Sequence, residues 1–157
     1  MKVGLGYDVH QLQEGYDLFI GGIKISHIKG AVGHSDADVL IHAICDALLG
    51  AANLGDIGVH FPDTSAEFKK IDSKILLKRV VQLISQKGYI IENIDSTVCL
   101  QRPKIAPYIP EIKETLAATL GIAIDNISVK ATTTEKLGFE GREEGVSAFA
   151  VVLLNNK

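Results

Sequence analysis

The spacing of apolar and polar residues predicts β-structure at the start of the chain. Positions Val3–His10 alternate with the period of two that is typical of a strand. Leu18–Ile20 and Ile23–Ile25 flank Gly21-Gly22, a pair that supplies the positive φ angles of a tight hairpin turn. The segment Ser26–Gly33 predicts a loop that leads to the next element.

The next pattern predicts a helix with polar residues along one side. Ser35 or Asp36 is a candidate cap, because a short side-chain oxygen accepts from the free amides of a first turn. The apolar face repeats at helical spacings: Val39, Leu40, Ala43, Ile44, Ala47, Leu48 and Ala51. A ridge of Asp38, His42 and Asp46 follows the same helix. Asp and His do not favour helix interiors, which suggests that something outside requires the ridge; a solvated face is the alternative for the two aspartates.

The rest of the chain alternates between helical and extended patterns. Two more amphipathic helices are expected. The first begins at Asp72 or Ser73 and ends before Gly88, and the second begins at Pro107 or Pro110 and ends at Gly121. Strands and one glycine-rich loop account for the remaining segments: a strand within Tyr89–Leu100 that is expected to begin at Ile94, Ile127–Thr133, the loop Gly138–Gly145, and Val146–Leu154.

These elements predict a single domain, residues 1–157, of the α/β two-layer class (α+β type). We expect a mixed sheet of about four main strands plus the small hairpin, with helices on one face. The last strand is apolar at nearly every position, although helices cover only one face. Its other face is therefore expected to be buried by something else, such as another subunit.

Composition places the chain among ordinary globular proteins. It has 157 residues, of which 46% are hydrophobic and 22% charged, and a net charge of -3. This balance argues against nucleic-acid binding, and no apolar run reaches the roughly 20 residues of a membrane helix. The N-terminus predicts a strand rather than a signal peptide. Cys45 and Cys99 lie in apolar runs, so we expect buried free thiols in a reducing, cytoplasmic compartment rather than a disulfide.

Asp8 and His10 are the first candidates for chemistry. Their spacing of two on a strand points both side chains to one face. Together with His42 from the helix they would supply three ligands and leave one tetrahedral position open, as in a catalytic zinc site. Asp46, one turn beyond His42, is expected to orient the His42 ring. The alternative for Asp8 and His10 is a solvated strand end.

Three other histidines compete for the role of ligand. His27 lies in a loop without an acidic neighbour, which predicts a surface position, and His60 is most simply a turn residue. His34 precedes a predicted helix, whose free amides and dipole attract anions. His34 and Ser35 are therefore candidates for holding a phosphate, and a plain loop histidine is the alternative.

A second polar cluster follows the strand that is expected to end at Thr133. The hydroxyls of Thr132, Thr133 and Thr134, with the glycine-rich loop and Arg142, could form a phosphate cradle. Glu135 is a hard oxygen ligand of the kind that magnesium takes together with phosphates. A soft-metal site, a hard-metal carboxylate and two anion cradles point to phosphoryl chemistry without naming a substrate.

Four motifs follow one another along the chain: Gly6-Tyr7-Asp8-Val9-His10; His34–Val39 with His42, Asp46 and Leu48–Ala52; Leu54–Gly58 with Phe61-Pro62-Asp63; and Lys130–Phe139 with Gly141-Arg142. In these motifs the chain resembles the 2-C-methyl-D-erythritol 2,4-cyclodiphosphate synthase family of the non-mevalonate isoprenoid pathway. The resemblance runs from the first predicted strand to the last. It implies a homotrimer with sheets facing the trimer axis and active sites between subunits.

The resemblance also implies an activity. The family's substrate is 4-diphosphocytidyl-2-C-methyl-D-erythritol 2-phosphate, whose 2-phosphate attacks its own β-phosphorus. The products are 2-C-methyl-D-erythritol 2,4-cyclodiphosphate and CMP. The implied metals are zinc on Asp8, His10 and His42, which the residue pattern had already grouped, and magnesium or manganese on Glu135.

Substrate contacts follow from the same resemblance. His34 and Thr133 match the family's transition-state positions, and Ser35 matches a contact to the erythritol phosphate. The ribose side and the following turn match Asp56, Ile57, Gly58, Phe61, Pro62, Asp63, Thr64 and Ser65. The cytidine pocket and the loops beside it match Leu100, Gln101, Arg102, Pro103, Lys104, Ile105, Ala106, Ala131, Thr132, Thr134, Phe139 and Arg142. Tyr7, Arg142 and Glu144 match the surroundings of an axial cavity that can hold an isoprenoid diphosphate.

Several positions depart from the family pattern, among them two acidic residues that add charge to the glycine-rich loop, Glu140 and Glu143. Tyr7 stands where Phe is common, Ser65 stands where the FPDTD motif ends in Asp, and Arg102 adds a charge to the cytidine segment. Two other functions stay open, the second of which also draws on the resemblance. One is a zinc phosphohydrolase, in which water is the nucleophile. The other is a trimeric module that binds isoprenoid diphosphates without turnover, although the intact metal positions speak against it.

Overall fold

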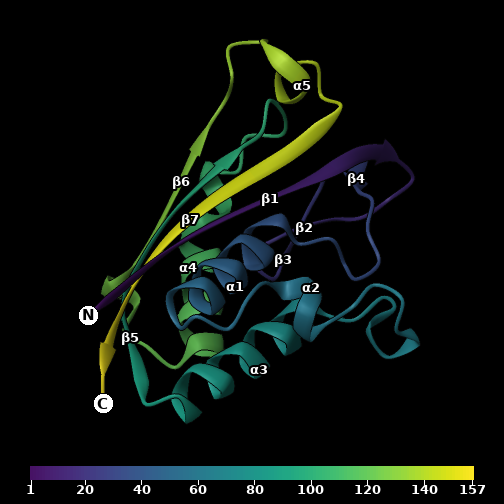
Figure 1. Ribbon diagram of the computed structural model, residues 1–157. Helices are drawn as coiled ribbons and strands as arrows, with labels where there is room; N and C mark the ends of the chain where they lie inside the picture. Colours follow the sequence, from purple (N-terminus) through teal and green to yellow (C-terminus); the bar gives the residue numbers. More distant parts are fainter.

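The computed structural model describes residues 1–157 and forms a five-stranded sheet in the order β4-β1-β7-β5-β6 (Figure 1). Its strands are β1 Lys2–Glu14, β4 Lys29–Ala31, β5 Tyr89–Cys99, β6 Ile127–Thr132 and β7 Gly145–Asn156. Strands β5 and β6 run parallel, and the other neighbours run antiparallel. The predicted mixed sheet is confirmed, with β4 as an additional edge strand.

The small hairpin forms a separate two-stranded sheet of β2 Leu18–Ile20 and β3 Ile23–Ile25. Gly21 and Gly22 have φ angles of 61° and 82°, which a side chain would rarely allow. The turn therefore has the conformation that the Gly-Gly pair predicts.

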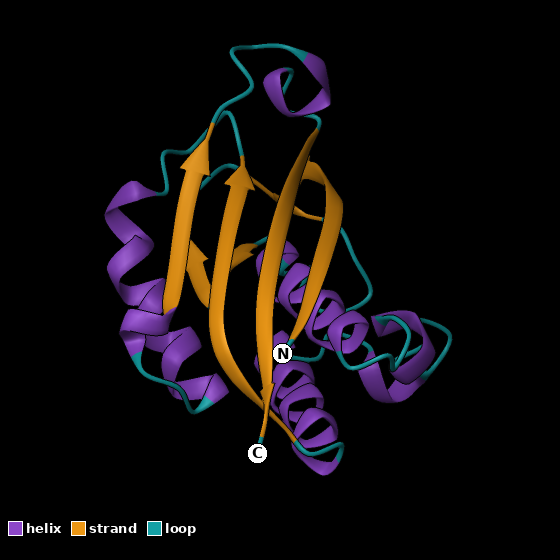
Figure 2. Ribbon diagram, turned by 60° about the vertical axis from the view of Figure 1, so that its left-hand side comes forward, coloured by secondary structure: helices purple, strands orange, loops and turns teal.

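The longer helices lie on one face of the sheet (Figure 2). They are α1 Val39–Ala51, α3 Ser73–Gln86 and α4 Ile109–Leu120. Shorter turns connect them: α2 Ile57–His60, α5 Gly138–Gly141 and 3₁₀ turns at Ala66–Phe68, Ala106–Tyr108 and Ile124–Asn126. A core cluster of 34 buried residues fills the space between the helices and the sheet. This is the two-layer packing that buries both apolar surfaces.

Two local predictions were wrong. Residues Lys29–Ala31 form β4 instead of a loop, because β1 extends past the other strands and offers Leu12–Glu14 as pairing partners. The cap of α1 is Asp38 rather than Ser35 or Asp36, and its side chain accepts from Ile41 N. Both outcomes depend on tertiary partners that local residue preferences do not include.

Helix α1 packs directly on the backbone of β1. Gly4 and Gly6 lie on the inner face of β1, the face that also carries Asp8 and His10. A Cβ atom added at Gly4 would lie 1.9 Å from the carbonyl oxygen of Ala47, and one at Gly6 would lie 1.9 Å from that of Ala43. The absence of side chains at these two positions therefore brings His42 of α1 within reach of β1.

The outer face of the sheet is apolar and exposed. Four alternate residues of β1 are 44–69% exposed there: Val3, Leu5, Tyr7 and Val9. On the neighbouring strand β7, Phe149 and Val151 are each 44% exposed, and the Phe149 ring centroid lies 4.8 Å from that of Tyr7. Contiguous exposed apolar surface of this kind is typical of an interaction face.

Two expectations from composition can be compared with the structure. Cys45 and Cys99 are both buried and free, as predicted. None of the helices combines the length and the hydropathy that crossing a membrane requires.

Candidate metal centre and adjoining cavities

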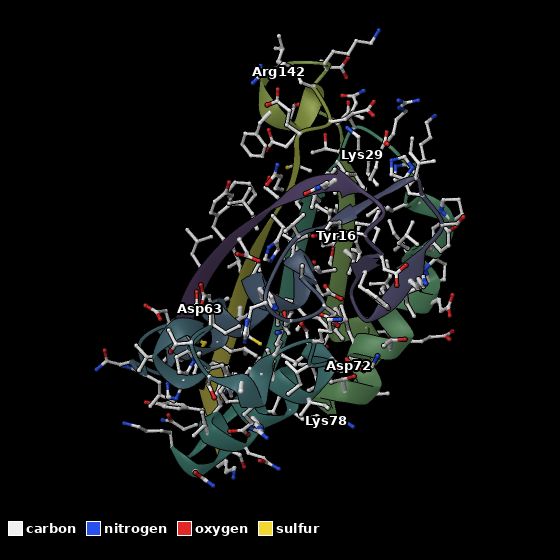
Figure 3. The ribbon with its side chains drawn as sticks, turned by 90° about the vertical axis from the view of Figure 1, so that its right-hand side faces the viewer. Tyr16, Lys29, Asp63, Asp72, Lys78 and Arg142 are labelled. Atoms are coloured by element: carbon white, nitrogen blue, oxygen red, sulfur yellow. The ribbon has the colours of Figure 1, made fainter.

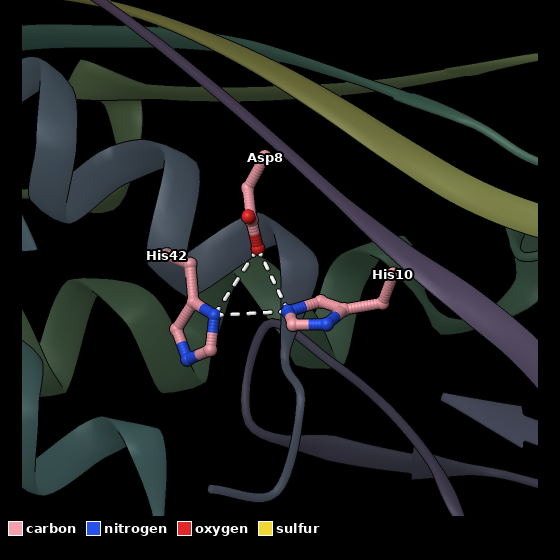
Figure 4. A group of neighbouring side chains, drawn as sticks. All are labelled: Asp8, His10 and His42. Carbon is pink, nitrogen blue, oxygen red and sulfur yellow. Dashed lines mark hydrogen bonds and ion pairs between the residues drawn. The ribbon is translucent and has the colours of Figure 1, made fainter. Parts of the chain in front are cut away.

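Asp8, His10 and His42 meet on the inner side of β1 (Figure 4). Asp8 Oδ2 lies 2.9 Å from His10 Nε2 and 3.1 Å from His42 Nδ1, and the two ring nitrogens are 3.1 Å apart. Ligand atoms on a tetrahedral zinc, at about 2.0–2.1 Å from the metal, are roughly 3.3 Å from one another. The three side chains therefore fit a divalent metal with very little movement.

The His10 ring is oriented for metal binding by the backbone. Its Nδ1–H donates to the carbonyl oxygen of Val32 at 3.1 Å. In a neutral imidazole the other nitrogen then carries the lone pair, and this nitrogen, Nε2, faces Asp8 and His42. A ligating histidine that donates its second N–H to a carbonyl is a common arrangement in metal sites.

Charges within the cluster shift the pKa values of two members. Burial by itself would raise the pKa of Asp8, but hydrogen bonds and charge from His10 and His42 outweigh it and lower this pKa to about 2. Burial by itself would lower the pKa of His42, but the hydrogen bond and charge of Asp8 outweigh it, so this pKa is raised. Without a metal, the cluster thus favours a carboxylate beside a protonated imidazole, and a divalent cation would replace that proton.

The predicted polar ridge does not act as expected. Asp46 Oδ1 accepts from Ile57 N at 2.7 Å, so Asp46 holds the start of α2 instead of orienting the His42 ring. Asp38 is fully buried and accepts from the backbone amides of Ile41, Gly21 and Gly22. The solvated-face alternative is also wrong for Asp38. Both aspartates bind backbone amides, a use that helical spacing alone does not reveal.

Nε2 of His42 instead has two serine hydroxyls as partners. Ser73 Oγ lies 3.0 Å away and Ser35 Oγ 3.1 Å away. Ser35 comes from the segment before α1, and Ser73 is the first residue of α3. The sequence pattern predicts Ser73 only as a candidate helix cap.

A cavity of about 220 Å³ adjoins the cluster. It is lined by His10, His34, Ser35, His42, Ile57, Phe61, Asp63, Phe68 and Leu76. The predicted phosphate residues His34 and Ser35 therefore face the same space as the metal cluster. His34 is held there by its Nε2, which donates to the carbonyl oxygen of Ser65 at 3.0 Å. The patterns did not indicate Phe68 and Leu76 as site residues, because both look like ordinary core positions.

The segment expected to bind cytidine lines a second cavity, of about 190 Å³. Its walls are Leu100, Gln101, Pro103, Lys104, Ile105, Ala106, Ala131, Thr132 and Thr133. It lies where parallel strands β5 and β6 end side by side. The exposed Arg102 points to another partner, forming an ion pair with Glu143 in which Nε and Oε1 are 2.6 Å apart.

Glu135 is exposed beside this second cavity. Its φ angle is 53°, in the left-handed region, and Thr133 Oγ1 lies 3.4 Å from its carboxylate. The amide of Lys136 donates to Gln101 Oε1 at 3.2 Å, which links this turn to the cavity wall. The carboxylate is therefore displayed on an anchored turn, free to meet a cation.

The remaining predicted residues lie in short helices and turns and are exposed or half-buried. Asp56 caps α2 by accepting from Val59 N, and Ile57, Phe61 and Asp63 line the first cavity. His60 Nε2 donates to the carbonyl oxygen of Leu54 at 2.8 Å, in agreement with a turn role. Phe139 lies against Gly145. Arg142 forms an ion pair with Glu144, in which Nε lies 2.9 Å from Oε1. Arg142 lies at the opposite end of the molecule from Asp72 and Lys78 (Figure 3).

Comparison with known sequences decides the family. Residues 1–155 match the sequence model of the YgbB family. The chain belongs to the YgbB family. A YgbB relative from Bacteroides fragilis (strain ATCC 25285), named 2-C-methyl-D-erythritol 2,4-cyclodiphosphate synthase, is 64% identical over 155 residues, which cover 99% of this chain and 98% of that protein.

Solved structures agree with this assignment of the YgbB chain. The bifunctional IspDF from Campylobacter jejuni superposes with a TM-score of 0.96 and 42% identity, over 99% of this chain and 42% of that longer one. A 2C-methyl-D-erythritol-2,4-cyclodiphosphate synthase in a CDP-bound form gives a TM-score of 0.91 and 35% identity, over 98% of this chain and 100% of that one.

Proposed function

We propose that this protein converts 4-diphosphocytidyl-2-C-methyl-D-erythritol 2-phosphate to 2-C-methyl-D-erythritol 2,4-cyclodiphosphate and CMP, in isoprenoid precursor synthesis. One observation carries the proposal: the cluster of Asp8, His10 and His42 opens into a cavity that also contains His34 and Ser35. The name of the relatives supports this substrate, and the second cavity supports a binding site for its cytidine.

Two metal ions would complete the site. Asp8, His10 and His42 would hold zinc, because two imidazoles and a carboxylate with one open position are the donor set of catalytic zinc. Glu135 would hold magnesium or manganese, which take carboxylate and phosphate oxygens. These ions would polarise the β-phosphate and offset the charge that develops on the departing CMP.

The side chains of the chain itself would bind and align the substrate. Ser35 would donate to the phosphate on the erythritol, while His34 and Thr133 would stabilise the charge that builds up in the transition state. Backbone groups of residues 100–106 and 131–134 would read the cytidine. Both reacting phosphates belong to one molecule, so the step is intramolecular. Holding them in line can lower the activation free energy by roughly 7–11 kcal/mol.

We propose further that the protein is a single-domain cytoplasmic enzyme that assembles as a homotrimer. The apolar outer face of β1 and β7 supports an assembly in which the sheets face a common axis, because such surface is rarely left in water. Tyr7, Arg142 and Glu144 would then surround an axial cavity suited to an isoprenoid diphosphate. The active sites would lie between subunits.

Isotopic labelling tests the proposed reaction against hydrolysis at the same metals. Turnover in water enriched in oxygen-18 is expected to give a product without solvent oxygen, because the 2-phosphate is the nucleophile. Incorporation of one solvent oxygen per turnover would instead identify a phosphohydrolase.

Zinc affinity is expected to fall as the pH falls. Because Asp8 raises the pKa of His42, zinc must displace a proton from that ring at any pH below the raised pKa. One displaced proton predicts a loss of about tenfold in apparent affinity per pH unit below this pKa. Competition with a chromophoric chelator between about pH 5 and 8, corrected for protonation of the chelator, measures the effect. An affinity that does not change with pH in this range would contradict it.

A Glu135→Gln variant is expected to cyclise the substrate about 100-fold more slowly, because the neutral amide binds magnesium poorly. Zinc content should stay unchanged. Initial rates as a function of magnesium concentration measure the effect, and Glu111→Gln, on the exposed surface of α4, is the matched control. An unaltered dependence on magnesium would show that Glu135 is not a ligand.

A further inference from the structure

A chain of partly buried polar groups lies behind the ring of His42, opposite Asp8. His42 Nε2 is 3.0 Å from Ser73 Oγ, and Ser73 Oγ in turn donates to Asp36 Oδ1. The Ser73 side chain has 0% exposure. Asp36 also accepts from Ser73 N at 3.0 Å and from Asp38 N at 3.2 Å. The carboxylate is thus fixed by two amides as well as by the hydroxyl.

The hydrogen positions along this chain follow from counting donors. An ionised carboxylate can only accept, so the single hydroxyl proton of Ser73 points to Asp36. Ser73 Oγ then presents a lone pair to the His42 ring, and Nε2 must be the donor in that contact. When a metal replaces the other ring proton, the lone pair that binds it is on Nδ1, the nitrogen that faces Asp8 and His10.

We propose that Ser73 is a positioning residue for the metal: it holds His42 in the tautomer whose Nδ1 can bind zinc, and Asp36 sets the direction of the Ser73 hydroxyl. This inference rests on the proposed zinc site. It gives His42 the support that the backbone carbonyl of Val32 gives His10. It also explains why the start of α3 is joined to the segment before α1.

The same arrangement prepares Ser35 for the substrate. Ser35 Oγ is 3.1 Å from His42 Nε2 and accepts from Ala37 N at 3.2 Å. Because Nε2 is a donor, the Ser35 hydroxyl proton has no acceptor on the ring. Ser35 lines the cavity beside the metal cluster, so its proton is free to donate to a phosphate oxygen there.

Two substitutions separate the parts of this relay, the hydrogen-bond chain from His42 through Ser73 to Asp36. Ser73→Ala removes the acceptor for Nε2–H and is expected to weaken zinc binding by about 10- to 100-fold. Asp36→Ala removes the carboxylate that accepts the hydroxyl proton of Ser73. The Ser73 hydroxyl then turns toward His42 and favours the wrong tautomer, so the loss of affinity should be at least as large. Ser96→Ala is the matched control, because Ser96 is also buried and donates to a backbone carbonyl on β6, away from the site.

The experiment measures zinc dissociation constants by chelator competition, together with the Nε2–H proton of His42 by long-range nitrogen–proton NMR of the zinc-loaded proteins. We expect a hydrogen-bonded, slowly exchanging Nε2–H in the zinc-loaded wild type, a faster-exchanging one in Ser73→Ala, weaker zinc binding in Asp36→Ala, and a cyclisation rate of Ser73→Ala that returns when zinc is added in excess. Unchanged zinc affinity in both variants would overturn the relay while leaving the zinc site intact. A Ser73→Ala protein that stays inactive when fully loaded with zinc would also overturn it. A wild-type protein that binds no zinc would overturn the proposed site itself.

Discussion

A His42→Ala protein is expected to bind no zinc at the cluster and to lose activity by about 10³-fold or more. His42 is the only ligand from α1, and without it Asp8 and His10 leave two positions of a tetrahedral metal unfilled. A metal that acts as a Lewis acid on a phosphate contributes several kcal/mol, and each 1.4 kcal/mol or so is a factor of ten in rate. Metal analysis and the rate of CMP release measure the two effects.

A suitable control for this variant is His27→Ala. His27 lies in the loop between β3 and β4, outside both cavities, and should retain zinc and activity when replaced. Circular dichroism should show the same helix and strand content in both variants, because His42 contributes little to the apolar core. Full activity in a metal-free His42→Ala protein would show that the reaction does not need zinc at this cluster.

Among the variants proposed here, Gly6→Ala is expected to lower the free energy of unfolding most, by at least about 3 kcal/mol. It should also destroy the metal site. The added Cβ would lie 1.9 Å from the carbonyl oxygen of Ala43, which is backbone and cannot rotate away. Helix α1 must therefore move off β1, and this motion carries His42 away from Asp8. Chemical denaturation measures the free energy of unfolding, and chelator competition measures zinc affinity.

Gly50→Ala is the matched control on the same helix. A Cβ at Gly50 would meet no atom within 4 Å, and the position is exposed near the end of α1. Alanine there should stabilise the protein by about 0.5–1 kcal/mol, because glycine is a poor helix former. A Gly6→Ala protein as stable as this control, with zinc still bound, would show that the close contact between α1 and β1 is not required.

The sequence predicts the metal cluster because each ligand follows from a local repeat of residues along a strand or a helix. Alternation on β1 places Asp8 and His10 on one face, and the helix supplies His42. Gly4 and Gly6 share the face of Asp8 and His10, and this was the available signal that another backbone approaches closely there. Local periodicity is therefore enough to propose the three ligands before the fold is known.

The partners of these ligands could not be predicted in the same way. Helical spacing places Asp46 one turn from His42, but the backbone amide of Ile57, the first residue of α2, donates to the Asp46 carboxylate. Ser73 reaches His42 only because α3 packs beside α1. The strand β4 likewise exists because β1 continues beyond its other partners. These contacts join segments far apart in sequence, and no local pattern records them.

Phosphorus NMR of the reaction mixture tests the central claim most directly. The purified protein would be mixed with 4-diphosphocytidyl-2-C-methyl-D-erythritol 2-phosphate and magnesium, with and without a zinc chelator. We predict the resonances of a cyclic diphosphate and of CMP, both lost on chelation and restored by added zinc. CMP together with a linear diphosphate would contradict cyclisation, and a cyclic product that forms equally well after complete removal of zinc would contradict the role of the Asp8, His10 and His42 cluster.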